Sequence, residues 1–269
     1  MNRNYLAKLG MEFDPFIKNS KDIIIKNTEY NEAMARLGIL ADIKGFGLLT
    51  GEPGRGKTTI LRNWAASLNT SMYRVIYSSL STLTVSDFYR ELAVCLGLTP
   101  AFRKNENFRI IQDEITRLAL DKRRTPVFIL DEANYIKPAI LNELKMLFNF
   151  EMDSRDRAVI LLAGLPQINN TLRLSAHEPL RQRLVMTYNL EGITKEEGRM
   201  YIESKVKGAG CHLPVFSENA VEALLNAANG TPRVINRLCS ASLLIAGSSG
   251  LAEVDAESVM KAINECELA

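Results

Sequence analysis

Short apolar runs alternate with segments of helical periodicity through the first two thirds of the chain. The runs read as buried strands, and continuous apolar strands of this kind are typical of parallel sheets covered on both faces. We therefore predict five strands, at residues 46–50, 73–77, 126–130, 158–163 and 184–190.

Apolar residues at helical spacing fill the intervals between these strands. Thr84 or Ser86 is the expected N-cap of one helix, and Gly97 its end. Strands that alternate with helices predict a doubly wound α/β domain with a parallel sheet. The expected helices lie at residues 31–40, 59–68, 84–96, 108–118 and 136–150, with a short one after Pro166.

The pattern changes after residue 191, and no strand signal remains. Thr194 and Glu197 have the spacing of a capping box, and Ser217 and Asp255 stand where further helices are expected to begin. Thr231 precedes a proline at the first position of another helix. We therefore predict an α/β domain at residues 1–191, with an irregular first 30 residues, and a small all-helical domain at residues 192–269.

Composition places the chain among globular proteins, since 46% of its 269 residues are hydrophobic and 24% are charged. No apolar run is long enough to cross a bilayer, and the N-terminus lacks a secretory signal, so a cytoplasmic location is expected. The four cysteines form no C-x-x-C pair, and only Cys211 adjoins a histidine, so no cysteine–histidine metal site is expected.

Net charge is only +2, and its distribution says more than its total. Residues 1–191 carry 26 Lys and Arg against 21 Asp and Glu, whereas residues 192–269 carry 7 against 10. A bound polyanion would therefore be expected to contact the first domain through a local basic patch.

A phosphate-binding loop is predicted between the first strand and the helix that follows it. The sequence GEPGRGKT at residues 51–58 fits G-x-x-x-x-G-K-[ST], and its glycines allow the backbone to approach an anion closely. A turn rich in Gly and Pro would not explain Lys57 and Thr58 at this point between strand and helix. We expect Lys57 to reach the β and γ phosphates of ATP and Thr58 to bind Mg²⁺, near a helix N-terminus. The residues expected to bind the nucleotide are Glu52, Pro53, Gly54, Arg55, Gly56, Lys57, Thr58 and Thr59.

Two acidic residues follow the apolar strand at 126–130. Asp131 is placed to hold the Mg²⁺ shell, and Glu132 to polarise the attacking water. Acid pairs after apolar runs also occur by chance, but the α/β context favours the catalytic reading. An ATPase that positions and neutralises the γ-phosphoryl group is therefore predicted.

Three arginines are candidates to neutralise the charge on the transferred phosphoryl group. Arg181 and Arg183 come just before the last strand, and Arg233 lies in the first turn of a helix in the small domain. Each can equally be a solvated surface residue. For Arg233 the surface interpretation is weaker, because a cation in the first turn opposes the helix dipole.

With these motifs in this order, the chain resembles the AAA+ ATPases: a P-loop α/β domain followed by a small all-helical lid. Among them it resembles the ExeA type, which includes general secretion pathway protein A and transposon-encoded relatives akin to TniB and TnsC. The residues that carry the resemblance are Tyr5, Leu6, Phe13, Pro15 and Phe16, GEPGRGKTT at 51–59, FILDEA at 128–133, LNEL at 141–144, FNFEMDS at 148–154, LLAGLPQ at 161–167, EPLRQRL at 178–184 and GTPRVIN at 230–236.

The resemblance implies roles for individual residues. Arg183 resembles the arginine finger that completes a neighbouring protomer's site, and Arg233 the lid sensor that touches the γ-phosphate of its own nucleotide. The first sensor, usually Gln or Asn in relatives, falls at Leu165, which cannot form a hydrogen bond through its side chain. Slow hydrolysis, or transfer of that role to Gln167, is the expected consequence.

The resemblance also implies a function: an ATP-dependent regulator of transposition that oligomerises on double-stranded DNA as a ring or filament and recruits or stimulates a transposase. Many weak phosphate contacts would then sum over the assembly. Two alternatives remain, a secretion-type ATPase that assembles an envelope complex and a slowly hydrolysing nucleotide switch. The candidate DNA contacts are Arg103, Lys104, Lys122, Arg123 and Arg124, each of which can also be a solvated tip.

Overall fold

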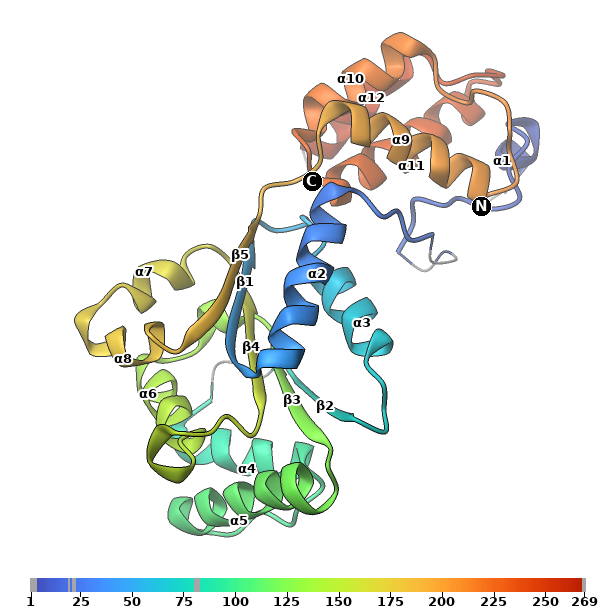
Figure 1. Cartoon of the computed structure of the whole chain (residues 1–269). Helices are drawn as coiled ribbons and strands as arrows, with labels where there is room; N and C mark the ends of the chain where they lie inside the picture. The colour runs from blue at the N-terminus through green and yellow to red at the C-terminus, as the bar shows by residue number, and fades with distance from the viewer. Residues whose placement is uncertain (1–3, 19, 21–22, 80–82, 268–269) are drawn as a thin grey trace. The chain divides into compact units, whose positions relative to one another are not determined.

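A five-stranded parallel sheet forms the centre of the larger of the two units into which the chain divides (Figure 1). The structure, a computed structural model, describes residues 4–18, 20, 23–79 and 83–267. The predicted doubly wound α/β fold is confirmed, and each strand lies within one residue of its expected bounds. The strands are β1 (Gly45–Gly51), β2 (Tyr73–Ser78), β3 (Thr125–Leu130), β4 (Val159–Gly164) and β5 (Leu184–Leu190), in the order β2-β3-β4-β1-β5 with all neighbours parallel.

Two units emerge from the contacts between residues. The α/β unit comprises Asn31–Pro53 and Lys57–Leu190. The helical unit comprises the residues up to Tyr30, the three residues Gly54–Gly56 of the phosphate loop, and the chain from Glu191 onward. The change of pattern near residue 191 thus coincides with a boundary between units, whereas the sequence pattern did not indicate that the first 30 residues group with the C-terminal helices.

The central strands are buried on both faces, as their apolar character predicts. Phe46, Phe128 and Ile160 belong to a core shared with α4, α5 and α6, and α2 and α3 lie on the opposite face of the sheet (Figure 1). At Gly47 a Cβ would lie 2.4 Å from Leu40 Cδ2, so glycine allows α2 to approach β1 closely. The helices of this unit are α2 (Thr28–Ile43), α3 (Lys57–Ser67), α4 (Val85–Cys95), α5 (Lys104–Thr116), α6 (Pro138–Leu147), α7 (Ile168–Leu172) and α8 (Glu178–Arg181).

Helix α6 ends earlier than its apolar pattern predicts, at Leu147 rather than residue 150. Side chains from other elements bind the carbonyl groups at its end. Gln112 Nε2 donates to Leu147 O at 3.1 Å, and Arg183 donates to Lys145 O and Phe148 O at 3.0 and 3.1 Å. Because these long-range donors satisfy the helix C-terminus, the chain can leave the helix there.

The helical unit has a core of its own and begins with a short helix that the sequence analysis missed. The expectation of an irregular start is wrong for α1 (Asn4–Lys8). Phe16 is buried in this core, packed edge-on against Phe216, and Ser240 Oγ donates to Asp14 Oδ2 at 2.6 Å. The capping box of Thr194 and Glu197 is present. The remaining helices are α9 (Lys195–Gly208), α10 (Glu218–Ala228), α11 (Pro232–Ser248) and α12 (Ala256–Glu267).

Candidate nucleotide site

The predicted phosphate loop runs from the end of β1 to the start of α3. Gly54 and Gly56 have φ values of +82° and +98°, a region that side chains with a Cβ rarely adopt. Lys57 is buried, and its Nζ donates to Gly51 O at 2.6 Å and Glu52 O at 3.2 Å. The loop therefore has the backbone freedom that wrapping an anion requires, and its ammonium group is held against the loop itself. The other predicted nucleotide-binding residues outside the helical unit, Glu52, Pro53, Thr58 and Thr59, are exposed.

Asp131 and Glu132 follow β3 at the same edge of the sheet as the phosphate loop, because the carboxyl ends of parallel strands meet there. Asp131 is only 4% exposed, and its Oδ1 accepts the backbone N–H of Glu132 at 2.9 Å. Glu132 itself is exposed and adopts a left-handed conformation, φ 53° and ψ 36°. Such strain at a non-glycine residue is typical of functional sites.

Tyr77, at the end of β2, was not expected in the site. Its hydroxyl donates to Asp131 Oδ2 at 3.1 Å. Burial, together with the negative charge of Asp131, raises the pKa of Tyr77 to about 12, so the hydroxyl remains a donor at neutral pH. The alternation of strand residues could not reveal this contact, since it depends on how β2 pairs with β3.

Asn134 lies near the end of β4, where Leu165 occupies the expected sensor position. Its Oδ1 accepts the backbone N–H of Leu165 at 2.9 Å. A Cβ at Gly164 would lie 2.7 Å from the same Oδ1, so glycine leaves the space for this amide. The polar side chain next to the expected sensor position is therefore that of Asn134. Gln167 is exposed and takes no part in the hydrogen bond between Leu165 N and Asn134 Oδ1.

Arg183, the predicted finger, is held within its own α/β unit. Besides its two bonds to carbonyls at the end of α6, its guanidinium forms an ion pair with Asp153 and lies over the ring of Phe46. The side chain is only 14% exposed. Arg181 is more exposed, and it contacts Glu178 at 3.9 Å.

Arg233 and Arg55 both lie in the helical unit. The guanidinium of Arg233 is exposed and has no partner among the described residues, while its backbone N–H donates to Gly54 O at 3.3 Å. Arg55 Nη1 donates to Asn229 O at 3.1 Å and Gly230 O at 2.7 Å. The charge of Arg55 is thus engaged by backbone carbonyls of this unit, although the sequence suggested contact with phosphate.

The candidate DNA contacts differ in how free their charges are. Lys104 Nζ pairs with Glu143 Oε1 at 2.6 Å, and Arg124 donates to Tyr73 O at 3.3 Å. Arg103 and Arg123 are exposed, and their side chains form no hydrogen bond or ion pair in the described part of the chain, whereas the charge of the exposed Lys122 helps to lower the pKa of Glu114. Arg103 and Lys104 lie at the start of α5, and residues 122–124 follow the turn that continues this helix.

Magnesium is the metal that this arrangement would suit. Within the described residues no group of three or more His, Cys, Asp or Glu could hold a metal. Mg²⁺ needs no such group, because it keeps several waters and takes one or two carboxylates together with substrate phosphates. Asp131 and Thr58 would supply oxygen ligands of this kind at the carboxyl edge of the sheet.

Comparisons with known proteins agree with the fold and the loop. Residues 41–172 match the family described as AAA domain. General secretion pathway protein A of Aeromonas hydrophila is 30% identical over 253 residues, which cover 91% of this chain but only 45% of that protein. The chain thus spans less than half the length of this relative.

Solved structures show the same fold at low sequence identity. Cdc6p of Pyrobaculum aerophilum superposes with a TM-score of 0.71 and 18% identity, over 93% of this chain and 70% of that one. The ORC1 protein of Aeropyrum pernix, solved in complex with DNA, gives a TM-score of 0.64 and 17% identity, over 94% and 69%. Residues 41–172 thus form an AAA domain, and its phosphate loop joins β1 to α3.

Proposed function

We propose that ATP is hydrolysed at the carboxyl edge of the sheet, with Lys57 on the β and γ phosphates and Glu132 as the residue that polarises the attacking water. Thr58 and Asp131 would hold Mg²⁺, which when bound offsets the charge of the phosphates. The proposal rests on one observation: the buried Asp131 and the strained, exposed Glu132 share an edge of the sheet with a loop containing two glycines at positive φ.

We further propose that Arg233 senses the γ-phosphate of its own nucleotide and that Arg183 completes the site of an adjoining protomer. Two observations support the role of Arg233. Its guanidinium has no partner among the described residues, and its backbone N–H donates a hydrogen bond to Gly54 O in the phosphate loop. For Arg183 the role requires release from Asp153, so finger action and assembly would be coupled.

At the level of the cell, we propose an ATP-dependent regulator of transposition that oligomerises on double-stranded DNA and recruits or stimulates a transposase in the cytoplasm. The transposon-type motifs support it, as does the likeness to an ORC1 protein solved with DNA. Arg103, Lys122 and Arg123, together with Lys104 and Arg124, are the proposed DNA contacts.

Binding to a labelled DNA duplex tests this proposal. At low salt, where phosphate contacts are strongest, binding should appear with a non-hydrolysable ATP analogue and be lost in Lys57→Ala. Glu132→Gln should retain nucleotide-dependent binding while losing turnover. Absence of nucleotide-dependent DNA binding would remove the proposal, and it would leave ATP hydrolysis untouched.

A secretion-type ATPase is the second candidate, favoured by the 30% identity to general secretion pathway protein A. No helix among the described residues is both long and apolar enough to cross a membrane. Co-fractionation of the chain with membranes, in place of binding to DNA, would support this candidate. Slow cycling as a nucleotide switch is compatible with either role, because Leu165 offers no side-chain hydrogen bond.

A further inference from the structure

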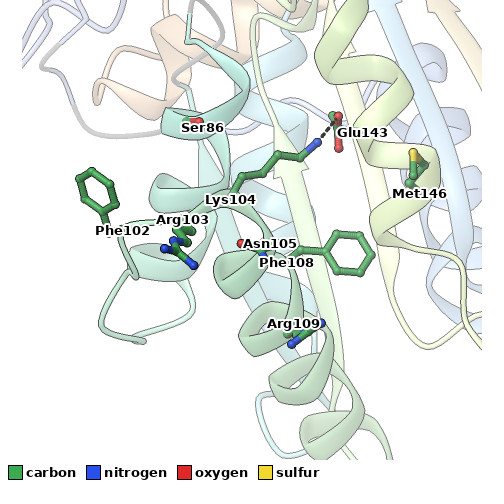
Figure 2. Close-up of a pocket in the computed structure, with 9 residues that line it drawn as sticks. All are labelled: Ser86, Phe102, Arg103, Lys104, Asn105, Phe108, Arg109, Glu143 and Met146. Carbon is green, nitrogen blue, oxygen red and sulfur yellow. Dashed lines mark hydrogen bonds and ion pairs between the residues drawn. The ribbon is translucent and has the colours of Figure 1, made fainter.

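A surface pocket of about 660 Å³ lies within the α/β unit, and none of its lining residues belongs to the nucleotide site (Figure 2). Its walls come from the start of α4, the loop before α5, the first turns of α5, and α6. Pockets of roughly 300–1,000 Å³ are the usual size for specific ligands. The character of the walls therefore indicates what kind of ligand fits.

Large apolar side chains are unusually exposed in this pocket. Phe102 is 86% exposed and Met146 59%, and Phe108 is only partly buried. Phe102 is nevertheless held in place, since Arg90 Nη2 donates to its carbonyl at 3.2 Å and the guanidinium lies 5.7 Å from its ring centre. Burying such a side chain is favourable, because its apolar surface is removed from water. These positioned, exposed apolar groups favour a partner that buries them.

The charge that remains unbalanced in the pocket is positive. Both oxygens of Glu143 are engaged, Oε1 by Lys104 Nζ at 2.6 Å and Oε2 by the Tyr89 hydroxyl at 2.8 Å. Arg103 and Arg109 are exposed, and the described structure gives their guanidinium groups no ion pair or hydrogen bond. In Figure 2, Phe102 and Arg103 lie on one side of the Lys104 chain, and Phe108 and Met146 on the other. Two free cations thus border an apolar recess.

We propose that this pocket binds an acidic peptide segment of a partner protein, anchored by an aromatic or large aliphatic side chain. The anchor contacts Phe108 and Met146, Phe102 covers the peptide, and carboxylates beside the anchor pair with Arg103 and Arg109. A nucleic acid fits less well, because a phosphate backbone gains nothing from the apolar walls. The inference concerns a protein partner and does not rest on DNA binding, but a peptide bound here would compete with DNA for Arg103 and Lys104.

Selection of short random peptides displayed against the full-length chain tests this site without a known partner. Enriched peptides should combine one aromatic or large aliphatic residue with at least two Asp or Glu. Synthetic copies, labelled with fluorescein and titrated by anisotropy, should bind at least about tenfold more weakly to Phe102→Ala and to the double variant Arg103→Glu/Arg109→Glu.

Matched controls lie elsewhere on the surface. Met152→Ala removes another exposed apolar side chain, one that is 99% exposed, and Arg173→Glu reverses another exposed cation. Both should bind the peptides within twofold of the wild type. Enrichment of peptides without the acidic and apolar combination, or binding unaffected by Phe102→Ala, would overturn the proposal. The pocket would be assigned to nucleic acid instead if no acidic peptide is enriched and a labelled single-stranded oligonucleotide binds the wild type but does not bind Phe102→Ala.

Discussion

The Tyr77 hydroxyl donates to Asp131 Oδ2 at 3.1 Å, which ties the end of β2 to the acidic residue at the end of β3. Asp131 Oδ1 is engaged by the backbone N–H of Glu132, so this carboxylate is fixed at both oxygens. A group that helps to hold a metal benefits from this fixed orientation. The contact with Tyr77 therefore supports the proposed role of Asp131, and the hydroxyl of Tyr77 can be removed by mutation without changing Asp131 itself.

Replacing Tyr77 by Phe should destabilise the fold by about 1 kcal/mol at pH 8, a value reduced for solvent screening because Tyr77 is 50% exposed. The pKa of Tyr77 is raised to about 12, so the native state favours the neutral hydroxyl. This stabilisation is complete below pH 10 and is lost as pH rises through 12. Urea denaturation of both proteins from pH 8 to pH 11.5 should show their difference shrinking above pH 10. A difference that stays constant over this range would contradict the assignment.

Leu165→Gln should raise kcat severalfold and leave the dissociation constant of ATP nearly unchanged. The reason is that a carboxamide at this half-buried position can hydrogen-bond water or phosphate, whereas leucine cannot. Single-turnover hydrolysis and titration with a fluorescent ATP analogue separate the two quantities. Leu165→Met, which changes shape without adding an amide, is the matched control and should show no gain.

Gly192 faces the side chain of Arg55, and the two positions should be energetically coupled. A Cβ on Gly192 would lie 1.7 Å from Arg55 Nη1 and 2.5 Å from Gly230 O, and its φ of +105° disfavours alanine as well. We expect Gly192→Ala to cost about 1–3 kcal/mol of stability. Adding Arg55→Ala should restore part of this loss, since it removes the side-chain clash but neither the backbone clash nor the strain. A double-mutant cycle measured by denaturation gives the coupling, and strictly additive effects would argue against the contact.

Local patterns were sufficient for the strands, most helices and the phosphate loop. Continuous apolar runs predicted β1, β3 and β4 because both faces of these strands are covered, and the capping box of Thr194 and Glu197 marked the start of α9. The spacing of glycines and Lys57 predicted the loop because backbone torsion and charge are local properties. Such features need no knowledge of the tertiary structure.

The features that sequence patterns did not reveal all depend on contacts across the chain. Tyr77 reaches Asp131 through strand pairing, and Asn134 reaches Leu165 over 31 positions. The end of α6 is fixed by Gln112 and by Arg183, neither of which is near it in sequence. Hydrophobic periodicity carries no information on such pairs, because it predicts that every polar side chain is exposed and does not identify a hydrogen-bond partner far away in the sequence.

Arg183 holds the end of α6 within its own protomer, and its proposed action on a neighbouring protomer leads to the most discriminating experiment on assembly. Its guanidinium binds Lys145 O, Phe148 O and Asp153 within one protomer, so Arg183→Ala should lower stability by about 1–3 kcal/mol through the lost charged hydrogen bonds. Asp153→Ala is the matched control, since it breaks the ion pair but leaves the arginine in place. If Arg183 acts only within its protomer, any loss of ATPase activity should follow the loss of stability in both variants.

Action on a neighbouring protomer makes a different prediction when two inactive variants are mixed. Lys57→Ala protomers cannot grip the phosphates but still present Arg183, and Arg183→Ala protomers retain an intact loop but lack the finger. Each alone should be inactive, whereas oligomers assembled from both should recover part of the ATPase activity, because a Lys57→Ala protomer completes the site of its Arg183→Ala neighbour. Turnover measured across mixing ratios should therefore pass through a maximum. If both variants fold and co-assemble but turnover shows no maximum across the mixing ratios, Arg183 does not act on a neighbouring site. Its role is then confined to holding the end of α6.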